Sequence, residues 1–284
     1  MEIINRRQRM ASIARKLRRE NKTVSFVPTM GALHEGHLSL VKEARQASDI
    51  VIVSIFVNPA QFNDKGDLER YPRDLTGDAA LLAEYEVDYI FAPETNEIYP
   101  DGFSTYVYVD GISEGLEGAS RPGHFRGVAT VVTILLNTVR PDMAFFGQKD
   151  AQQVAVIKRL TIDLGFETEI VVIPTVREES GLAMSSRNAN LTPEEREKAA
   201  VIFKGLKEAK LAFRNGIRNA SELTEIVRKT VESEPLARID YVAAVDTGTL
   251  EPIEKIDDSE VILSTAVFFG KIRLIDNITL NRRQ

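Results

Sequence analysis

Apolar runs alternate with helically spaced segments through the first part of the chain. Residues 24–27 and 50–57 are apolar except for one serine each, a pattern typical of strands buried on both faces of a sheet. Residues 36–48 have helical spacing, and residues 125–139 are apolar nearly all round, which predicts a helix buried between layers. The other predicted elements are helices at 74–85 and 152–164, strands at 89–92, 143–146 and 169–173, and an irregular strand at 106–109. Strands and helices in alternation predict an α/β domain, with a parallel sheet covered by helices on both faces.

The pattern changes near residue 177. Thr192 and Pro193, followed by two glutamates, combine a cap, a first-turn proline and acids at the positive end of the helix dipole. This start predicts a helix to about residue 215. A second helix is predicted from about residue 220, with strands at 239–245, 261–269 and 272–280. We therefore expect two domains, an α/β domain over 1–176 and a smaller α+β domain over 177–284.

The N-terminal segment 3–20 is basic and amphipathic, with Ile4, Met10, Ile13 and Leu17 spaced for one helical face. A mitochondrial presequence has a similar pattern, but we interpret the segment as a surface helix packed on the sheet. It lacks the apolar core of a secretory signal. The longest apolar stretches are too short to span a bilayer, so no membrane partner is expected.

Composition narrows the class of protein. The 284 residues carry a net charge of -6, which argues against a broad nucleic-acid surface but permits a locally basic pocket. There is no cysteine, so disulfides and thiolate metal sites are excluded. These features are compatible with a cytoplasmic enzyme, which is the location we expect.

Polar or glycine-rich residues follow four of the predicted strands. In a parallel sheet the carboxyl ends of the strands lie at one edge, and ligands bind there. Residues that follow these strands should therefore lie together at that edge. The four segments are the turn with His34 and His37, the turn with Asn58 and Gln61, the segment 147–150, and the segment leading to 184–188. Their convergence predicts a ligand site at that edge.

Each segment has a plausible chemistry and a plainer alternative. A helix N-terminus attracts phosphate, and His34 and His37 can donate hydrogen bonds to it, unless one caps the helix and the other is only solvated. Lys149 can reach a phosphate as a point charge, although most surface lysines are solvated. Ser185, Ser186 and Arg187 are suitable phosphate ligands on a loop that can close, or an ordinary linker.

Further polar groups fit a small anionic or hydroxylated substrate. Gln152 or Gln153 suits hydroxyls and carbonyls, and the other can be a structural amide. Arg121 and His124 suit a carboxylate or phosphate, with a surface loop as the alternative. The sequence has no Gly-x-x-x-x-Gly-Lys loop, no Gly-x-Gly-x-x-Gly and no His-Glu-x-x-His. A bound metal would need carboxylates and phosphate oxygens, as Mg²⁺ does.

Six motifs taken together resemble the pantothenate synthetase family of the His-x-Gly-His nucleotidyltransferase superfamily. They are PTMGALHEGH (28–37), VNPAQF (57–62), YPR (71–73), RPGHFRGV (121–128), FGQKD (146–150) and GLAMSSRN (181–188). The resemblance implies a Rossmann-like first domain and a lid-like second domain in a homodimer. It implies ATP-dependent condensation of (R)-pantoate with β-alanine to pantothenate, AMP and pyrophosphate through a pantoyl adenylate. The alternatives are another adenylyltransferase of the superfamily and a non-catalytic nucleotide-binding regulator.

The resemblance also implies roles for individual residues. ATP contacts are expected from Met30, Gly31, Ala32, Leu33, His34, Glu35, Gly36, His37, Gly147, Gln148, Lys149, Asp150, Val176, Met184, Ser185, Ser186 and Arg187. The catalytic residues among them are His34, His37, Lys149, Ser185 and Arg187, with His37 at the family's proton-donor position. Pantoate and β-alanine contacts are expected from Asn58, Gln61, Arg121, His124 and Gln153. Mg²⁺ would bridge the ATP phosphates near Asp78, although the preceding Gly77 is acidic in some family members.

Overall fold

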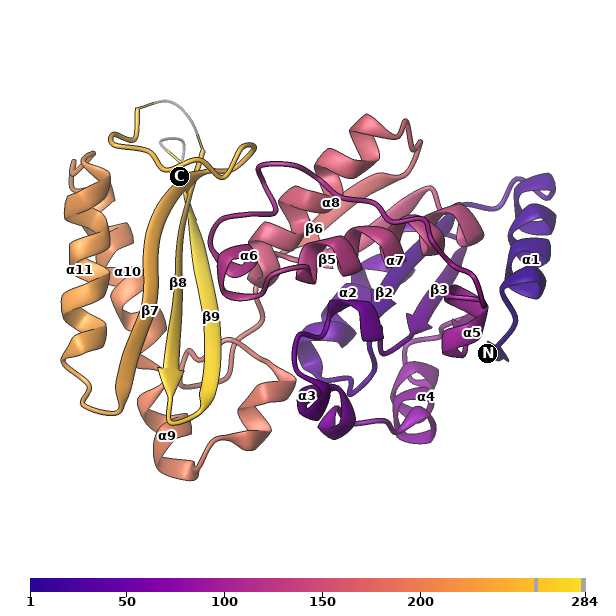
Figure 1. The fold of residues 1–284 in the computed structure, drawn as a ribbon, viewed down its shortest axis with the longest axis horizontal. Helices are drawn as coiled ribbons and strands as arrows, with labels where there is room; N and C mark the ends of the chain where they lie inside the picture. Colours follow the sequence, from indigo (N-terminus) through magenta and orange to yellow (C-terminus); the bar gives the residue numbers. More distant parts are fainter. Residues whose placement is uncertain (258–259, 282–284) are drawn as a thin grey trace. The chain divides into compact units, whose positions relative to one another are not determined.

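The structure is a computed structural model that describes residues 1–257 and 260–281. It divides into two compact units (Figure 1). The first comprises Met1–Gly147 and Gln152–Ile173, and the second comprises Gln148–Ala151 and Pro174–Gln284. Each unit has apolar cores of its own.

The first unit is built on a parallel sheet. Within the described residues its six strands run in the order β1-β4-β3-β2-β5-β6, and every adjacent pair is parallel. The strands are β1 (Glu2–Ile4), β2 (Val24–Thr29), β3 (Ile50–Ile55), β4 (Tyr89–Phe91), β5 (Met143–Gly147) and β6 (Glu169–Ile173). The predicted α/β class with a parallel sheet is confirmed.

The strand order places a topological switch point between β2 and β5. From β2 the chain adds β3 and β4 on one side, and it later adds β5 and β6 on the other. Ligands of open parallel sheets bind where the order reverses, outside the carboxyl ends. The four strands that precede the candidate residues, β3, β2, β5 and β6, are consecutive neighbours in the sheet.

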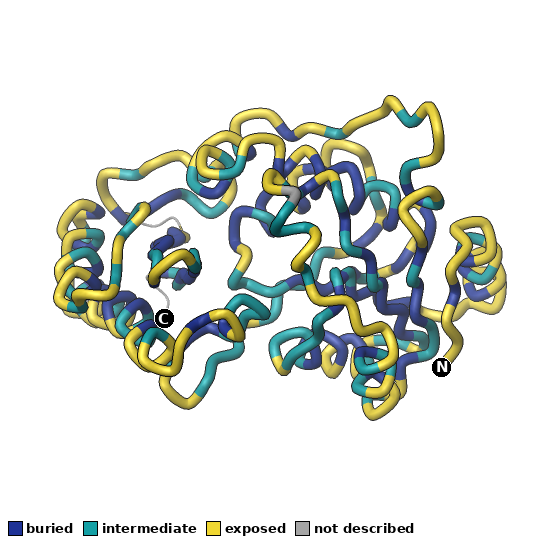
Figure 2. Tube along the Cα trace, turned by 60° about the horizontal axis from the view of Figure 1, so that its bottom comes forward, coloured by how far each residue is buried: buried dark blue, intermediate teal, exposed yellow. Residues whose placement is uncertain are grey.

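Two apolar cores lie on the two faces of this sheet. Side chains alternate between the faces along each strand, so Phe26 and Ile52 join one core while Val27 and Val53 join the other. Helices α1 (Arg7–Arg19), α7 (His124–Val139) and α8 (Ala151–Asp163) cover the first face, and α2 (Glu35–Ala47) and α4 (Leu75–Ala83) cover the second. Figure 2 shows a buried interior in this unit and mostly exposed chain near the N-terminus.

One local prediction for this unit was wrong, and another was confirmed except at its start. The irregular strand at 106–109 does not form, because this segment lies along α7, where the Val107 N–H donates to Thr130 Oγ1 at 3.0 Å. The N-terminal helix begins only at Arg7, because the residues before it form β1 and pair with β4. The short helices of the unit are η1 (Pro59–Gln61), α3 (Lys65–Arg70), α5 (Thr95–Ile98) and α6 (Glu117–Ser120).

The second unit packs helices on an antiparallel sheet. Its strands, in the order β7-β8-β9, are β7 (Ala237–Asp246), β8 (Val261–Phe269) and β9 (Ile272–Leu280). Its helices are η2 (Gln148–Asp150), η3 (Ser186–Asn190), α9 (Pro193–Lys198), α10 (Val201–Arg214) and α11 (Ala220–Glu232). Apolar residues of α10, α11 and the sheet form its core, which confirms the predicted α+β class.

The helix predicted from Thr192 to about residue 215 is in fact two helices. Its start is confirmed, because Thr192 and Glu195 form a capping box. The helical hydrogen-bond pattern changes near Ala200. The Ala200 N–H donates to Glu197 O at 3.3 Å, and the Ile202 N–H donates to Ala199 O at 3.2 Å. These bonds span three residues instead of four, so α9 ends at Lys198 and α10 begins at Val201.

Candidate functional site

The turn between β2 and α2 brings two imidazole rings together. Gly31 and Ala32 have φ values of +81° and +52°, so two consecutive left-handed residues reverse the chain after β2. His34 then caps α2, because its Nδ1 accepts from the Gly36 N–H at 3.1 Å. The ring centroids of His34 and His37 are 4.2 Å apart. Both half-buried rings therefore lie at the N-terminus of α2, where backbone N–H groups favour an anion.

Asp78 holds this turn from α4. The carboxylate is buried, and its oxygens accept from the N–H groups of Ala32 at 3.0 Å and Leu33 at 2.8 Å. A Cβ on Gly31 would lie 2.8 Å from Asp78 Oδ2, so the close approach requires glycine there. Asp78 thus fixes the backbone conformation of the turn by accepting two of its N–H groups.

This use of Asp78 bears on the expected magnesium site. Both oxygens already have backbone donors, and the described residues contain no group of three His, Cys, Asp or Glu side chains that could hold a metal ion. The chain offers no built cage for Mg²⁺ at this position. Magnesium ligation by Asp78 stays a prediction that the geometry does not support.

The segment after β3 is held by a buried amide network. Asn58 Nδ2 donates to Gln61 Oε1 at 3.0 Å and to Gly127 O at 3.1 Å. The Tyr99 hydroxyl donates to Asn58 Oδ1 at 2.7 Å, and burial raises the pKa of Tyr99. Gln61 Nε2 lies 3.0 Å from Met30 Sδ, so the ends of β2 and β3 meet. Asn58 is a structural residue of this network, and Gln61 is its link to the histidine turn.

Arg121 and His124 fix the backbone of Gln61. His124 Nδ1 is 2.8 Å from Gln61 O, and His124 Nε2 is 3.2 Å from Arg121 Nη1. A guanidinium only donates, so Nε2 must accept, and Nδ1 then carries the hydrogen that Gln61 O accepts. Arg121 Nη2 donates to the same oxygen at 3.4 Å. Direct substrate contact by this pair stays a prediction.

The two candidate glutamines of α8 differ in environment. Gln152 is buried, donates to Ile112 O at 2.8 Å and accepts from the Glu117 N–H at 2.9 Å. It is therefore the structural amide of the two. Gln153 is half-buried, which is compatible with the substrate contact that was expected of it.

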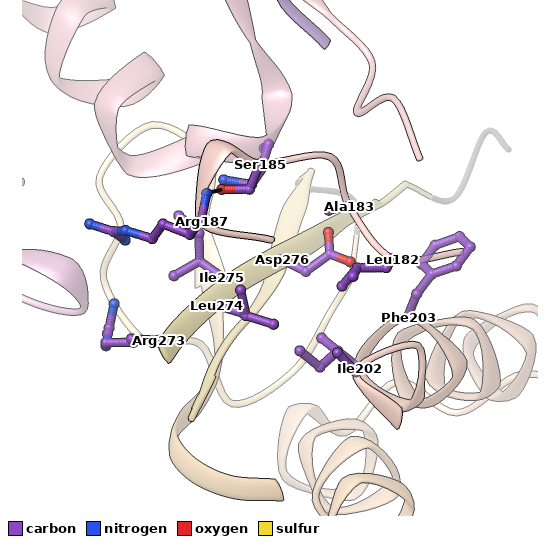
Figure 3. Close-up of a pocket in the computed structure, with 12 residues that line it drawn as sticks. Leu182, Ala183, Ser185, Arg187, Ile202, Phe203, Arg273, Leu274, Ile275 and Asp276 are labelled. Carbon is purple, nitrogen blue, oxygen red and sulfur yellow. Dashed lines mark hydrogen bonds between the residues drawn. The ribbon is translucent and has the colours of Figure 1, made fainter. Parts of the chain in front are cut away.

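In the second unit, three expected ATP ligands line one pocket. Lys149, Ser185 and Arg187 share it with Arg273 and Asp276, and an apolar wall is formed by Leu182, Ala183, Ala199, Ile202, Phe203, Leu274 and Ile275. Figure 3 shows the contributions of the 182–187 loop, the start of α10 and β9. The basic side chains and the serine hydroxyl are groups that can bind a phosphate.

The loop that carries Ser185 and Arg187 is folded into a defined shape. The Met184 N–H donates to Val176 O at 3.0 Å, and Ser185 Oγ caps η3 by accepting from the Arg187 N–H at 3.2 Å. Asn188 Nδ2 donates to Ala183 O at 3.1 Å. Val176, Met184 and Ser186 therefore belong to one hydrogen-bonded segment with the pocket residues. Of the segment before α8, Gly147 ends β5, Gln148 and Lys149 are half-buried, and Asp150 is exposed.

The family model described as pantoate–β-alanine ligase matches residues 2–279. The chain belongs to the pantoate–β-alanine ligase family. It is 51% identical over 280 residues to the pantothenate synthetase of Thermosipho africanus, covering 99% of this chain and 100% of that protein. The predicted resemblance and the ligase class of enzyme are confirmed.

Solved structures of the family have the same fold. The pantothenate synthetase of Thermus thermophilus superposes with a TM-score of 0.91 at 44% identity, over 98% of this chain and 99% of that one. The pantoate–β-alanine ligase of Francisella tularensis, in complex with β-γ ATP and β-alanine, has a TM-score of 0.79 at 40% identity, over 98% and 97%. Among the described residues of this ligase, no helix is both long enough and apolar enough to cross a membrane.

Proposed function

We propose that this ligase condenses (R)-pantoate with β-alanine through a pantoyl adenylate, with ATP as the adenylyl donor. The observation that carries the proposal is the convergence of Lys149, Ser185 and Arg187 on one pocket of the second unit. The Francisella tularensis relative is complexed with β-γ ATP and β-alanine, which supports ATP and β-alanine as substrates here. The proposed ATP contacts are residues 30–37, 147–150, Val176 and residues 184–187.

The first step transfers the adenylyl group. A pantoate carboxylate oxygen attacks the α-phosphorus, the bond from this phosphorus to the bridging oxygen breaks, and pyrophosphate leaves with the electron pair. Negative charge grows on the phosphoryl oxygens, so nearby donors stabilise the transition state. The paired rings of His34 and His37 and the N-terminus of α2 are suited to this, as are the charges of Lys149 and Arg187.

The second step forms the amide. The β-alanine amine attacks the acyl carbon, the bond from this carbon to the phosphate oxygen breaks, and AMP leaves while the amine loses a proton. The adenylate must be kept from water until then, and we assign this to the 177–284 region acting as a lid. His37 is the candidate for the proton transfer of the reaction.

Neutral amides are proposed to hold pantoate. Gln61 and Gln153 can each donate to and accept from a hydroxy acid, and Asn58 fixes the Gln61 amide at 3.0 Å. Arg121 and His124 would assist by holding the Gln61 backbone. Mg²⁺ would enter with ATP and offset the charge of its phosphates, because this ion takes few protein ligands and both Asp78 oxygens are already used by the backbone. We also propose a homodimer in the cytoplasm.

Exchange of labelled pyrophosphate into ATP tests the proposal. The folded enzyme should catalyse exchange only when pantoate is present, and β-alanine should then drive AMP release with pantothenate formation. Exchange without pantoate, or none at all, contradicts the adenylate route. Transfer of a nucleotide to a phosphate ester, with β-alanine unconsumed, would instead identify another adenylyltransferase of the superfamily.

The variant His37→Ala tests the catalytic assignment. We expect pantoate-dependent exchange to fall by roughly 10²–10⁴-fold, the usual range for a group that transfers a proton or stabilises charge. The variant Glu43→Ala, which changes an exposed residue of the same helix outside the proposed contacts, is the control. Near-normal exchange by His37→Ala would show that this ring is only structural.

A further inference from the structure

We propose that Asp276 and Asn277 of β9 are positioning residues for adenylation, and that they hold the two ATP-binding segments of the second unit. This rests on the proposed function, which assigns ATP contacts to Lys149 and to residues 184–187. Both side chains are only 3% exposed. Adjacent residues of a strand point to opposite faces, so each can serve a different segment.

Asn277 fixes the backbone from which Lys149 projects. Its Nδ2 donates to Gln148 O at 3.0 Å and to Lys149 O at 2.9 Å, and its Oδ1 accepts from Gln148 Nε2 at 3.1 Å. The side-chain amide thus uses both its donor and its acceptor on two consecutive residues. A displaced η2 would move the Lys149 ammonium away from its place in the pocket.

Asp276 fixes the other segment through Arg177. The guanidinium donates from Nη1 to Asp276 Oδ2 at 2.5 Å and from Nη2 to Oδ1 at 3.0 Å, which is a two-pronged pair. The same Nη1 donates to Gly181 O at 3.2 Å, and the guanidinium lies 3.5 Å from the Phe203 ring centroid. Arg177 is therefore locked in one orientation, and it holds the loop that leads to Ser185.

A buried ion pair of this kind contributes geometry more than stability. The cost of removing two charges from water offsets most of their attraction, so a stable fold has no need of it. Burial raises the pKa of Asp276, while Arg177 and, more weakly, Lys149 oppose that rise. The strand that carries the pair is hydrogen-bonded to β8, where Thr265 and Ser264 lie opposite Asp276 and Asn277.

A double-mutant cycle between Asn277 and Lys149 tests the first contact. Asn277→Ala should lower kcat/KM for ATP in pantoate-dependent exchange by roughly 10- to 100-fold, the cost of misplacing a catalytic group by about an ångström. In a Lys149→Ala background the same change should have almost no further effect, because coupled residues are not additive. An undiminished effect in that background overturns the proposal. Thr279→Ala, two residues along the same strand, is the control.

A second variant and a wild-type measurement complete this test. Asn277→Asp retains the size of the side chain but loses both N–H donors, so it should show the same coupling if Asn277→Ala does not fold. Wild-type enzyme that binds ATP in calorimetry without pantoate-dependent exchange overturns the proposed function, and this inference with it. If the wild-type enzyme catalyses pantoate-dependent exchange but the effects of the Asn277 and Lys149 substitutions are additive, only the inference is overturned.

Substituting Asp276 alone and then together with Arg177 distinguishes a positioning role from a contribution to stability. Asp276→Asn leaves a buried guanidinium without its anion, so both thermal stability and exchange should fall. The double variant Asp276→Asn with Arg177→Gln removes both charges and should recover stability, while exchange stays roughly 10-fold or more below wild type because the two-pronged contact is lost. Recovery of exchange together with stability would show that the pair is only structural.

Discussion

Asp78 commits its carboxylate to the backbone of the turn before α2, so its substitution should disturb ATP binding. An asparagine in its place can accept only one of the two N–H groups, and its own NH₂ would face the other. We expect Asp78→Asn to lose about 1–3 kcal/mol of stability, the cost of a buried donor without an acceptor. We also expect the KM for ATP to rise several-fold.

The Mg²⁺ dependence of the same variant distinguishes positioning from metal binding. If Asp78 acts on the turn, the Mg²⁺ concentration that gives half-maximal activity should match that of wild type. The exposed Glu84→Gln, at the end of the same helix, is a suitable control. A large shift in Mg²⁺ requirement for Asp78→Asn alone would show that its carboxylate is a metal ligand after all.

The roles of some single residues were predicted from the sequence, and those of others were missed. The cap at His34 was one of two alternatives, and the structure shows it together with the ring contact to His37. The role of Asp276 and Asn277 was missed, although two polar residues inside an apolar strand pattern were a visible signal. Hydrogen bonds between residues more than 100 positions apart, such as Asn277 with Lys149, have no signature in one sequence.

The contact between η1 and α7 depends on one glycine. A Cβ on Gly127 would lie 2.3 Å from Ala60 O and 2.7 Å from the Gln61 nitrogen, and both of these atoms belong to backbone that cannot rotate away. We expect Gly127→Ala to force η1 off the helix, with a loss of about 1–3 kcal/mol of stability. The KM for pantoate should rise while that for ATP changes little.

Urea unfolding and steady-state kinetics check this expectation. The matched control is Gly115→Ala, because a Cβ there meets no atom within 4 Å. If Gly127→Ala and Gly115→Ala behave alike, the close packing of η1 on α7 has no part in pantoate binding.

Elements with a strong apolar period were predicted closely, and irregular ones were not. The strands β8 and β9 have the bounds that the sequence predicted, since long alternating or continuous apolar runs leave little choice. The break between α9 and α10 was missed because Ala199 and Ala200 are good helix formers, and tertiary packing overrides that preference. The segment around Val107 resembled a strand, but its apolar side chains pack on α7.

The pH dependence of stability should contain a contribution from the turn after β7. Asp246 accepts from the N–H groups of Thr249 at 2.9 Å and Gly248 at 2.8 Å, and the bond to Thr249 does most to hold its pKa below the ordinary 3.8. A lowered pKa stabilises the folded protein fully above that ordinary value. The contribution is lost as the pH falls through the folded-state pKa.

The variant Asp246→Ala should therefore be less stable than wild type at about pH 7 by about 1 kcal/mol, and the difference should shrink toward pH 3. Urea unfolding at the two pH values measures this difference. The exposed Glu251→Ala, in the same turn, controls for the loss of one negative charge. A difference that is constant with pH would mean that the Asp246 carboxylate is not the origin of the effect.

The parallel sheet and the α+β unit were predictable from alternation and capping, but the grouping of residues 148–151 with the later part of the chain was not. Composition and periodicity there show only the start of a helix, and the decisive partner, Asn277, lies near the other end of the sequence. The four strand ends were expected at one edge because parallel topology requires it. What their side chains do there depended on contacts that only coordinates reveal.

The return of residues 148–151 to the second unit means that neither unit is one uninterrupted stretch of chain. A gene truncated after codon 173 would encode Lys149 without the strand that holds its carbonyl, so the fragment would bear the lysine in an unanchored loop. Two fragments expressed separately, 1–173 and 174–284, would have to reassociate before that loop regained its amide partner. Fragment complementation would thus report on Asn277, because reconstituted activity would depend on an amide supplied in trans.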